Sequence, residues 1–105
     1  MYLTDWKDIE EFRAREGIFG KLLEKGTIQV ILYRYLPGSV FETHSHPEEQ
    51  MTIGMEGELE FEIDDEKVIF GPGSIAHIPG GAPHSAVNRG KEEAITINIY
   101  SPPRK

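Results

Sequence analysis

The sequence predicts an all-β domain, built as a closed barrel or a two-sheet sandwich. Glycine and proline divide the chain at short intervals, with 11 Gly and 7 Pro among 105 residues. The segments between them are short and rich in β-branched and aromatic residues, which is the pattern of strands joined by tight turns. Several of these segments also alternate apolar and polar residues, as expected for a sheet with one buried face.

We expect one domain spanning residues 1–105, because this length is typical of a single compact core. Residues 1–26 would form an N-terminal arm or strand, residues 27–100 the barrel, and residues 101–105 a C-terminal tail. Apolar residues recur at three-residue spacing from Trp6 onward. One or two helical turns and an extended arm both remain open for this first segment.

The strand expected at 27–36 is apolar on both of its alternating faces. Ile28 and Leu32 lie on one face, and Ile31, Tyr33 and Tyr35 lie on the other. A strand of an antiparallel sheet normally has one face in water. We therefore expect the outer face of this strand to be covered by a second subunit, which predicts a homodimer.

The remaining strands follow in order along the chain. They are expected at 58–63, 67–70, 74–78 and 94–100, with a hairpin turn at 64–66 between the first two. In the first, Leu59 and Phe61 share the inward face. In the last, Thr96, Asn98 and Tyr100 share one face, and the alternating isoleucines share the opposite face.

Charge and cysteine content exclude several classes of function. The formal charge is −7, from 11 basic and 18 acidic side chains, so we expect neither a nucleic-acid nor an anionic-membrane partner. The chain has no cysteine, which rules out disulfides, thiolate metal sites and cysteine nucleophiles. No apolar run has the length of a membrane span or a signal peptide. A cytoplasmic protein is the resulting expectation.

His44 and His46 carry the strongest chemical signal in the sequence. On an extended strand, residues two apart point to the same face, with Cα atoms about 6.6 Å apart. Two imidazoles at that spacing can share one metal ion at bond lengths of roughly 2.0–2.2 Å. Gln50 and His84 are the residues that could complete the ligand set from neighbouring strands.

These residues lie within two motifs that resemble those of the cupin family. Residues 38–57 match G-x5-H-x-H-x3,4-E-x6-G, except that Gln50 stands in the place of the glutamate. Residues 73–88 match G-x5-P-x-G-x2-H-x3-N at every position. The resemblance implies a cupin double-stranded β-helix, a jelly-roll barrel of antiparallel strands. It also implies a metal ion inside the barrel, bound by His44, His46, Gln50 and His84.

The expected cofactor is one divalent transition metal per chain. Zn, Ni, Fe, Mn and Cu are not distinguished by this ligand set. Three neutral imidazoles and the Gln50 amide leave the charge of a dication uncompensated, so the pocket would be locally cationic in an acidic protein. Such a pocket is predicted to bind a small anionic molecule, above all one with a carboxylate that completes the coordination.

The C-terminal segment further resembles the KdgF-type cupins, which act on 4,5-unsaturated uronates. The resemblance implies a substrate-contacting or catalytic set in which Tyr100 is the aromatic residue and Arg104 binds the carboxylate. Asn98 stands where those proteins have an aspartate. A carboxylate exchanges a proton as a general acid or base, whereas an amide at neutral pH offers only hydrogen bonds.

The sequence leaves alternatives open for the function and for the roles of three neighbouring residues. The protein is either a metal-dependent isomerase acting on unsaturated uronates, in carbohydrate metabolism, or a cupin that binds a small ligand without turnover. A metal-dependent dioxygenase is a weaker alternative. Among the neighbouring residues, His77 is expected on the surface or in packing, and Asn88 to bond backbone groups in a turn. Glu48 is expected in solvent or beside a histidine.

Overall fold

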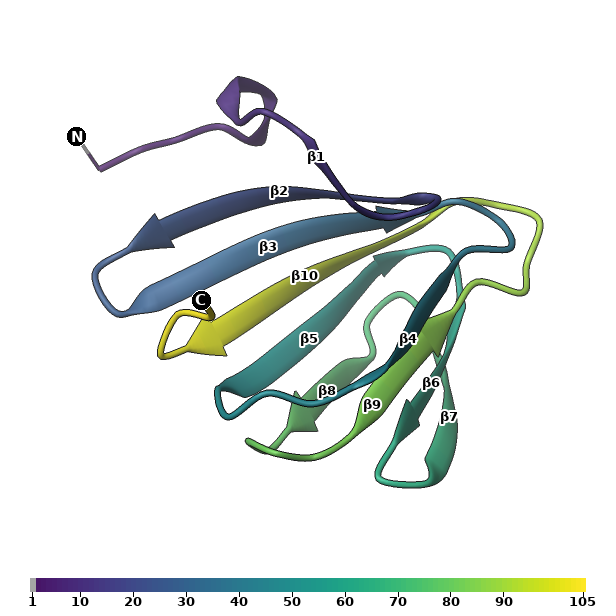
Figure 1. The fold of residues 1–105 in the computed structure, drawn as a ribbon. Helices are drawn as coiled ribbons and strands as arrows, with labels where there is room; N and C mark the ends of the chain where they lie inside the picture. The colour runs from purple at the N-terminus through teal and green to yellow at the C-terminus, as the bar shows by residue number, and fades with distance from the viewer. Residues whose placement is uncertain (1) are drawn as a thin grey trace.

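The computed structural model describes residues 2–105, and within them ten strands form two facing antiparallel sheets (Figure 1). The strands are β1 (Phe12–Arg15), β2 (Ile18–Lys25), β3 (Ile28–Tyr35), β4 (Val40–His44), β5 (Glu49–Glu56), β6 (Leu59–Ile63), β7 (Glu66–Phe70), β8 (Ile75–Ile78), β9 (His84–Val87) and β10 (Ala94–Ser101). A 3₁₀ turn at Trp6–Asp8 precedes them. The predicted all-β jelly roll is confirmed.

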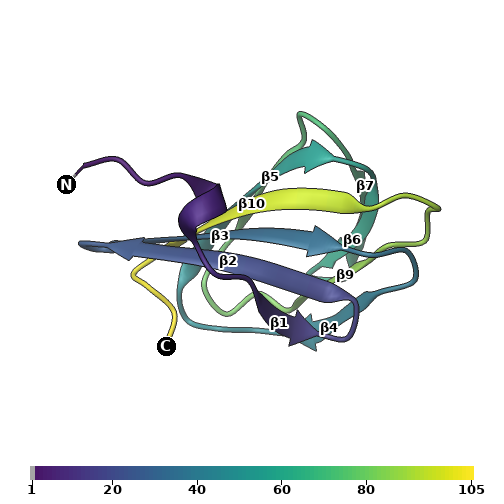
Figure 2. The same ribbon diagram turned by 90° about the horizontal axis from the view of Figure 1, so that it is seen from above.

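The order of strands brings distant parts of the sequence together. The six-stranded sheet runs β1-β2-β3-β10-β5-β8, and the four-stranded sheet runs β4-β9-β6-β7. Every neighbouring pair is antiparallel. Viewed from above, β10 lies beside β3 although about sixty residues of chain separate them (Figure 2). As a result, β4, β5, β9 and β10 surround one interior.

The N-terminal residues combine both conformations that the sequence left open. Asp5 caps the 3₁₀ turn, with its Oδ1 accepting a hydrogen bond of 2.9 Å from the Lys7 backbone N–H. After this turn the chain is extended. Strands β1 and β2 add to the six-stranded sheet, and β2 pairs with β3 from Ile18 to Lys25.

The core lies between the two sheets and is mainly aromatic. Its buried members include Tyr33, Tyr35, Phe41, Leu59, Phe61, Phe70 and Tyr100. Phe61 and Phe70 stack with ring centroids 4.4 Å apart. The inner face of β10 is unusual because it buries Thr96 and Asn98 together with Tyr100. Buried polar groups need hydrogen-bond partners, so this face has to be organised around the site it lines.

The backbone bears on the hairpin turn expected at 64–66 and on the presence of membrane-spanning helices. The β6–β7 hairpin turns at Asp64 and Asp65, whose φ angles of 52° and 70° give the left-handed conformation that short hairpin turns use. Among the described residues, no helix is long and apolar enough to cross a membrane.

Candidate metal centre

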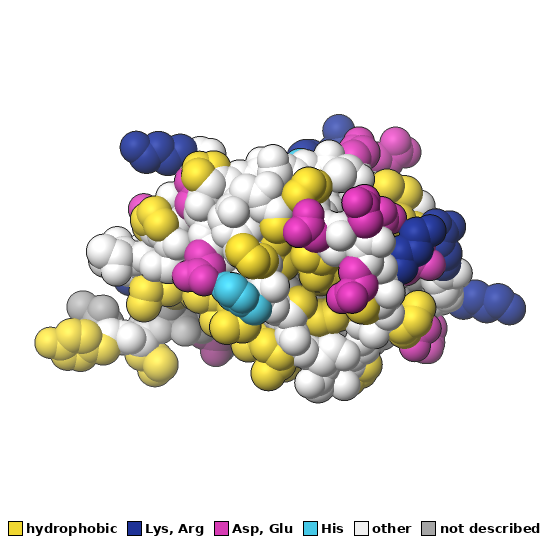
Figure 3. Space-filling model, turned by 90° about the horizontal axis from the view of Figure 1, so that it is seen from below, with side chains coloured by type: hydrophobic (Ala, Val, Ile, Leu, Met, Phe, Trp, Pro, Cys, Tyr) yellow, Lys and Arg dark blue, Asp and Glu magenta, His cyan; other side chains and the backbone are white. Residues whose placement is uncertain are grey.

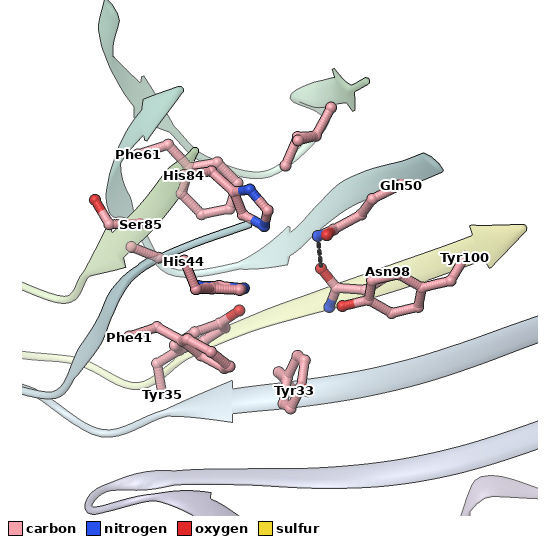
Figure 4. Close-up of a pocket in the computed structure, with 12 residues that line it drawn as sticks. Tyr33, Tyr35, Phe41, His44, Gln50, Phe61, His84, Ser85, Asn98 and Tyr100 are labelled. Carbon is pink, nitrogen blue, oxygen red and sulfur yellow. Dashed lines mark hydrogen bonds between the residues drawn. The ribbon is translucent and has the colours of Figure 1, made fainter. Parts of the chain in front are cut away.

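Three strands and one loop bring the predicted ligands together inside the barrel, and Figure 4 shows three of them, His44, Gln50 and His84. His44 ends β4 and pairs directly with His84, the first residue of β9. Gln50 lies on β5, where it pairs with Tyr100 of β10. His46 sits in the loop between β4 and β5. Backbone pairing therefore fixes three of the four positions, and the short β4–β5 connection places the fourth.

The three histidines are close enough to share one ion. One ring nitrogen from each of His44, His46 and His84 lies within 4.8 Å of the others. A metal bound at about 2.1 Å by each nitrogen allows separations of up to about 4.2 Å between them. Small rotations of the rings would therefore bring this cluster to coordination distance. The predicted set could hold a metal.

Each imidazole is held in the same tautomer by the backbone. The Nδ1 atoms of His44, His46 and His84 hydrogen bond to the carbonyl oxygens of Glu42, Glu48 and Ala82, at 2.9, 3.0 and 2.9 Å respectively. A carbonyl oxygen can only accept, so each Nδ1 carries the proton. Each neutral ring therefore presents the bare lone pair of Nε2, which is the arrangement that metal-binding histidines use.

The amide of Gln50 adds a fourth lone pair to this cluster. Its Oε1 lies 3.0 Å from His46 Nε2, while its Nε2 donates to Thr52 and Asn98 on the other side. In the neutral ring with its proton on Nδ1, the lone pair of His46 Nε2 faces the Gln50 Oε1 at that distance. His84 Nε2 is also buried and has no hydrogen-bond partner within residues 2–105. A cation would satisfy all of these atoms, so the residues present fit a metal.

Burial keeps His44 and His84 in the neutral form that ligation requires. Desolvation lowers the pKa of His84 to about 4, against the opposing effect of the Ala82 carbonyl. Desolvation also lowers the pKa of His44, opposed by the Glu42 carbonyl. The nearby charge of Arg104 lowers both values further. At neutral pH both rings are therefore ready to bind a metal without losing a proton first.

Three residues near the predicted ligands, Glu48, His77 and Asn88, differ in burial and in hydrogen-bond partners. The Glu48 carboxylate lies 3.6 Å from His46 Nδ1 and is largely buried, so the expectation that it faces solvent is wrong and the alternative, a place beside a histidine, holds. His77 is exposed and hydrogen bonds to Glu49, on the surface as expected. Asn88 is fully buried and donates to two backbone carbonyls, which confirms its structural role in a turn.

The structure also brings the predicted pocket residues close to the triad. Tyr100 is 2% exposed, and its ring centroid lies 5.6 Å from that of His46. The Arg104 guanidinium carbon lies 5.3 Å from the centre of the Tyr100 ring. The Arg104 carbonyl accepts a hydrogen bond from Gln29, which holds the C-terminal tail against the barrel. Asn98, on β10, lines a cavity that lies beside His44 and His84.

Other cavity residues were missed by the sequence reasoning. The walls include Tyr33, Tyr35, Phe41, Phe61 and Ile78, and the ring hydroxyls of Tyr35 and Tyr100 point inward (Figure 4). The sequence held a signal for two of these residues, because Tyr33 and Tyr35 share one face of the apolar strand expected at 27–36. Burial raises the pKa of Tyr33, Tyr35 and Tyr100, so all three phenols stay protonated.

The cavity beside the histidines is small. Its volume of about 30 Å³ compares with roughly 10–15 Å³ needed for one water molecule. Within residues 2–105, no aspartate or glutamate lines it. The arrangement can therefore bind a metal and hydrogen bond to a small acceptor group, but it presents no carboxylate for proton transfer.

Comparisons with known proteins agree with this architecture. The family model for the cupin domain, Cupin_2, matches residues 31–100. KdgF from Halomonas sp. is 23% identical, with a TM-score of 0.87, over 94% of this chain and 91% of that one. An RmlC-like cupin from Shewanella frigidimarina is 20% identical, with a TM-score of 0.91, over 100% of this chain and 94% of that one.

A cupin-superfamily sugar phosphate isomerase from Silicibacter pomeroyi is 22% identical, with a TM-score of 0.80, over 96% of this chain and 74% of that one. A search of the curated proteins finds no match. At these identities the solved structures establish the fold alone, whereas the family model covers two thirds of the sequence. The chain belongs to the Cupin_2 family of cupin-domain proteins.

Proposed function

We propose that the protein binds one divalent transition metal per chain through Nε2 of His44, His46 and His84 and Oε1 of Gln50. The observation that carries this proposal is the convergence of one ring nitrogen from each of the three histidines within 4.8 Å, with Gln50 Oε1 3.0 Å from His46 Nε2. When bound, the metal would supply a Lewis acid that polarises an oxygen of the ligand. Three imidazoles and an amide fit Zn, Ni, Fe, Mn or Cu.

We propose that the ligand is a small carboxylate-bearing molecule of the sugar-acid type. A dication held by four neutral ligands keeps its full charge, and Arg104 adds a second positive charge close to the histidines. The protonated phenols of Tyr33 and Tyr100 can donate to an anion. The similarity to KdgF supports an unsaturated uronate, the substrate class that the sequence resemblance implies.

The size of the cavity favours a particular way of binding. A volume of about 30 Å³ admits a carboxylate group but not a sugar ring. The carboxylate would therefore enter toward the metal on the side where Arg104 lies over the Tyr100 ring, while the remainder of the ligand stays outside the cavity. An arginine and a carboxylate can form two parallel hydrogen bonds, which would fix the orientation of the ligand.

Binding without turnover is the activity that this cavity supports best. General acid or base catalysis needs a group that exchanges protons near neutral pH, and it typically contributes 10²–10⁴-fold in rate. Asn98 cannot exchange a proton, and the phenols hold theirs. Isomerisation of unsaturated uronates is the second candidate, favoured by the likeness to KdgF. A dioxygenase is disfavoured because its usual iron ligands are two histidines and a carboxylate.

Elemental analysis of the purified protein tests the metal. We expect one equivalent of a divalent transition metal per chain in the natural sequence, and none in a His44→Ala/His84→Ala double variant. Replacing the exposed His77 with alanine is the matched control, because His77 lies outside the cluster and should leave the metal content unchanged. Full occupancy in the double variant would refute the site.

A titration calorimetry experiment with a 4,5-unsaturated monouronate tests the ligand. We expect saturable binding that requires the metal and weakens at least tenfold in an Arg104→Gln variant. Loss of the ultraviolet absorbance of the unsaturated sugar would report turnover in the same samples. Fast metal-dependent turnover would replace the binding proposal with the isomerase. No binding of any uronate would remove the sugar-acid ligand and leave the metal site standing.

A further inference from the structure

A chain of buried polar side chains runs from the candidate metal ligand into the wall of the barrel. Its members are Gln50, Thr52, Asn98, Thr96 and Tyr35, none of them more than 5% exposed. Gln50 and Thr52 come from β5, Asn98 and Thr96 from β10, and Tyr35 from β3. The chain therefore crosses three adjacent strands on the inner face of the six-stranded sheet.

Asn98 is the centre of this chain, and all its hydrogen-bonding positions are used. Its Oδ1 accepts from Thr52 Oγ1 at 2.8 Å and from Gln50 Nε2 at 3.2 Å. Its Nδ2 donates to Thr96 Oγ1 at 2.8 Å and to the Ile31 carbonyl at 3.2 Å. An asparagine side chain has two donors and two acceptor lone pairs, so no position is left over for a ligand.

These contacts determine which end of the Gln50 amide faces the histidines. Both Nε2 hydrogens of Gln50 are taken, one by Thr52 Oγ1 and one by Asn98 Oδ1. If the amide turned over, its NH₂ group would meet the bare His46 Nε2, and the two would form a hydrogen bond in place of a metal site. The turned amide would also direct Oε1 at Asn98 Oδ1, and two buried acceptors repel one another.

We propose that Asn98 is a positioning residue: it locks the Gln50 amide with Oε1 toward the three histidines, and it does not contact the bound ligand. This inference rests on the proposed metal site. The inference also explains why position 98 carries an amide and not a carboxylate. The Ile31 carbonyl oxygen lies opposite this side chain and needs a hydrogen-bond donor there. A carboxylate would place an oxygen 3.2 Å from that carbonyl oxygen.

Two substitutions at the same residue separate positioning from stability. Asn98→Leu removes the acceptor that would repel a turned-over Gln50 Oε1, whereas Asn98→Asp keeps an oxygen acceptor at that place and loses the donors to Ile31 and Thr96. Both variants should unfold at lower temperature than the natural protein. Only Asn98→Leu should release the Gln50 amide. Asn98→Ala, which removes the same acceptor with a smaller side chain, serves if Asn98→Leu does not fold.

The probe is Co²⁺ alone, read by its visible absorption bands, which report the coordinating atoms. The natural protein should bind one Co²⁺, and Gln50→Ala should give a shifted spectrum because an oxygen ligand is lost. We expect Asn98→Leu to show the Gln50→Ala spectrum and an affinity for Co²⁺ weaker by about tenfold or more. Asn98→Asp should keep the natural spectrum. Thr96→Val is the matched control, since Thr96 contacts Asn98 but not Gln50.

Each outcome decides a separate point. A natural spectrum and affinity in Asn98→Leu, or in Asn98→Ala if that variant is the one measured, would overturn the positioning role. An unchanged spectrum in Gln50→Ala would show that Gln50 is not a ligand, which overturns the inference but leaves a three-histidine site. Co²⁺ binding that survives His44→Ala/His84→Ala, or no Co²⁺ binding by the natural protein, would refute the metal site itself and the inference with it.

Discussion

At the scale of single residues, the backbone decides the chemistry of the three histidines. Each ring donates Nδ1–H to a carbonyl two positions away in the sequence, which fixes both its tautomer and its direction. A motif identifies which histidines converge but does not show which nitrogen faces inward. Which nitrogen faces inward depends on the backbone carbonyls that bond Nδ1. The three rings can bind one metal only when their Nε2 atoms all face the same point.

Asn98 shows the limit of residue-by-residue reasoning from sequence. Its parity on the last strand put it on one face with Thr96 and Tyr100 but did not say which face is inside; the structure buries all three. Its partners Gln50 and Thr52 lie almost fifty positions earlier in the chain, and the pairing of β5 with β10 brings them together. Hydrogen bonds between strands so far apart in sequence cannot be read from local patterns.

A prediction at this scale concerns two glycines that meet between β5 and the loop after β7. A Cβ atom on Gly54 would lie 2.1 Å from the carbonyl oxygen of Gly71, whereas a Cβ on Gly71 would meet nothing closer than 3.8 Å. Gly54→Ala should therefore destabilise the protein by about 2–3 kcal/mol, because backbone must move. The matched Gly71→Ala variant should stay within about 1 kcal/mol of the natural protein.

Thermal unfolding measures both glycine variants. For a domain of this size, 1 kcal/mol corresponds to roughly 4–8 °C in Tm, so Gly54→Ala should lower Tm by about 10 °C or more. Equal melting temperatures for the two alanine variants would contradict the close backbone approach at Gly54.

At the scale of elements, Arg34 joins the segment before β1, the strand β3 and the segment before β10. Its guanidinium donates to both carboxylate oxygens of Glu11 at 2.8 Å and to Glu93 at 3.1 Å. It also lies 4.7 Å above the Phe19 ring. Hydrogen bonding to Arg34 lowers the pKa of Glu11 below its usual value of 4.5. The N-terminal residues are thus fastened to the sheet by charge.

This arrangement predicts a stability effect that depends on pH. The pairs are partly exposed and worth about 0.2–1 kcal/mol each, so Arg34→Gln should lower stability by about 1 kcal/mol at pH 7. Because the folded pKa of Glu11 is lowered, its contribution is present above pH 4.5 and is lost as pH falls through the folded value. The difference between variant and natural protein should shrink toward pH 3.

Denaturant unfolding at pH 7, 5 and 3 provides the measurement. Arg89→Gln is the control, because Arg89 makes a single contact of 3.4 Å with Glu60 on the surface. Its effect should be smaller than that of Arg34→Gln at every pH. A stability loss in Arg34→Gln that is as large at pH 3 as at pH 7 would show that packing on Phe19, and not the ion pairs, is responsible.

The elements themselves were predictable to different degrees for a physical reason. In the hairpin of β6 and β7, strand β6 alternates apolar and acidic residues and two aspartates mark the turn, so its signal lies in the local sequence. Strand β2 mixes Lys21, Leu22, Leu23 and Glu24 without clear alternation. Its conformation is set by pairing with β3 along its whole length, which is a tertiary effect.

At the scale of the whole molecule, charge and apolar surface are unevenly distributed. Figure 3 shows one face on which acidic side chains stand among hydrophobic ones, while the basic side chains lie toward its ends. The cavity differs from this acidic surface: within residues 2–105 no acidic side chain lines it, and the charge of Arg104 is near enough to lower the pKa of His44 and His84. An anion would be drawn toward the cavity and away from the acidic surface.

The outer face of the six-stranded sheet forms two apolar rows that cross its strands. In the first row, the strand register places Leu23 beside Val30, Val30 beside Ile99, and Ile99 beside Met51. The second row runs through Leu32, Ile97, Ile53 and Ile75. The sequence indicated this face on β3, and the fold extends it over β2, β10, β5 and β8.

We predict that these rows form the interface of a homodimer, since apolar rows that cross five strands are more than a monomer normally leaves uncovered. Light scattering at micromolar concentration should report about twice the chain mass of 11.9 kDa. Ile97→Glu places a charge in the centre of the second row and should yield a folded monomer. Val40 is 46% exposed on the other sheet, so Val40→Glu is the matched control and should leave the dimer intact. A mass near 11.9 kDa for the natural protein would refute the dimer, and a dimeric Ile97→Glu variant would move its interface to another face.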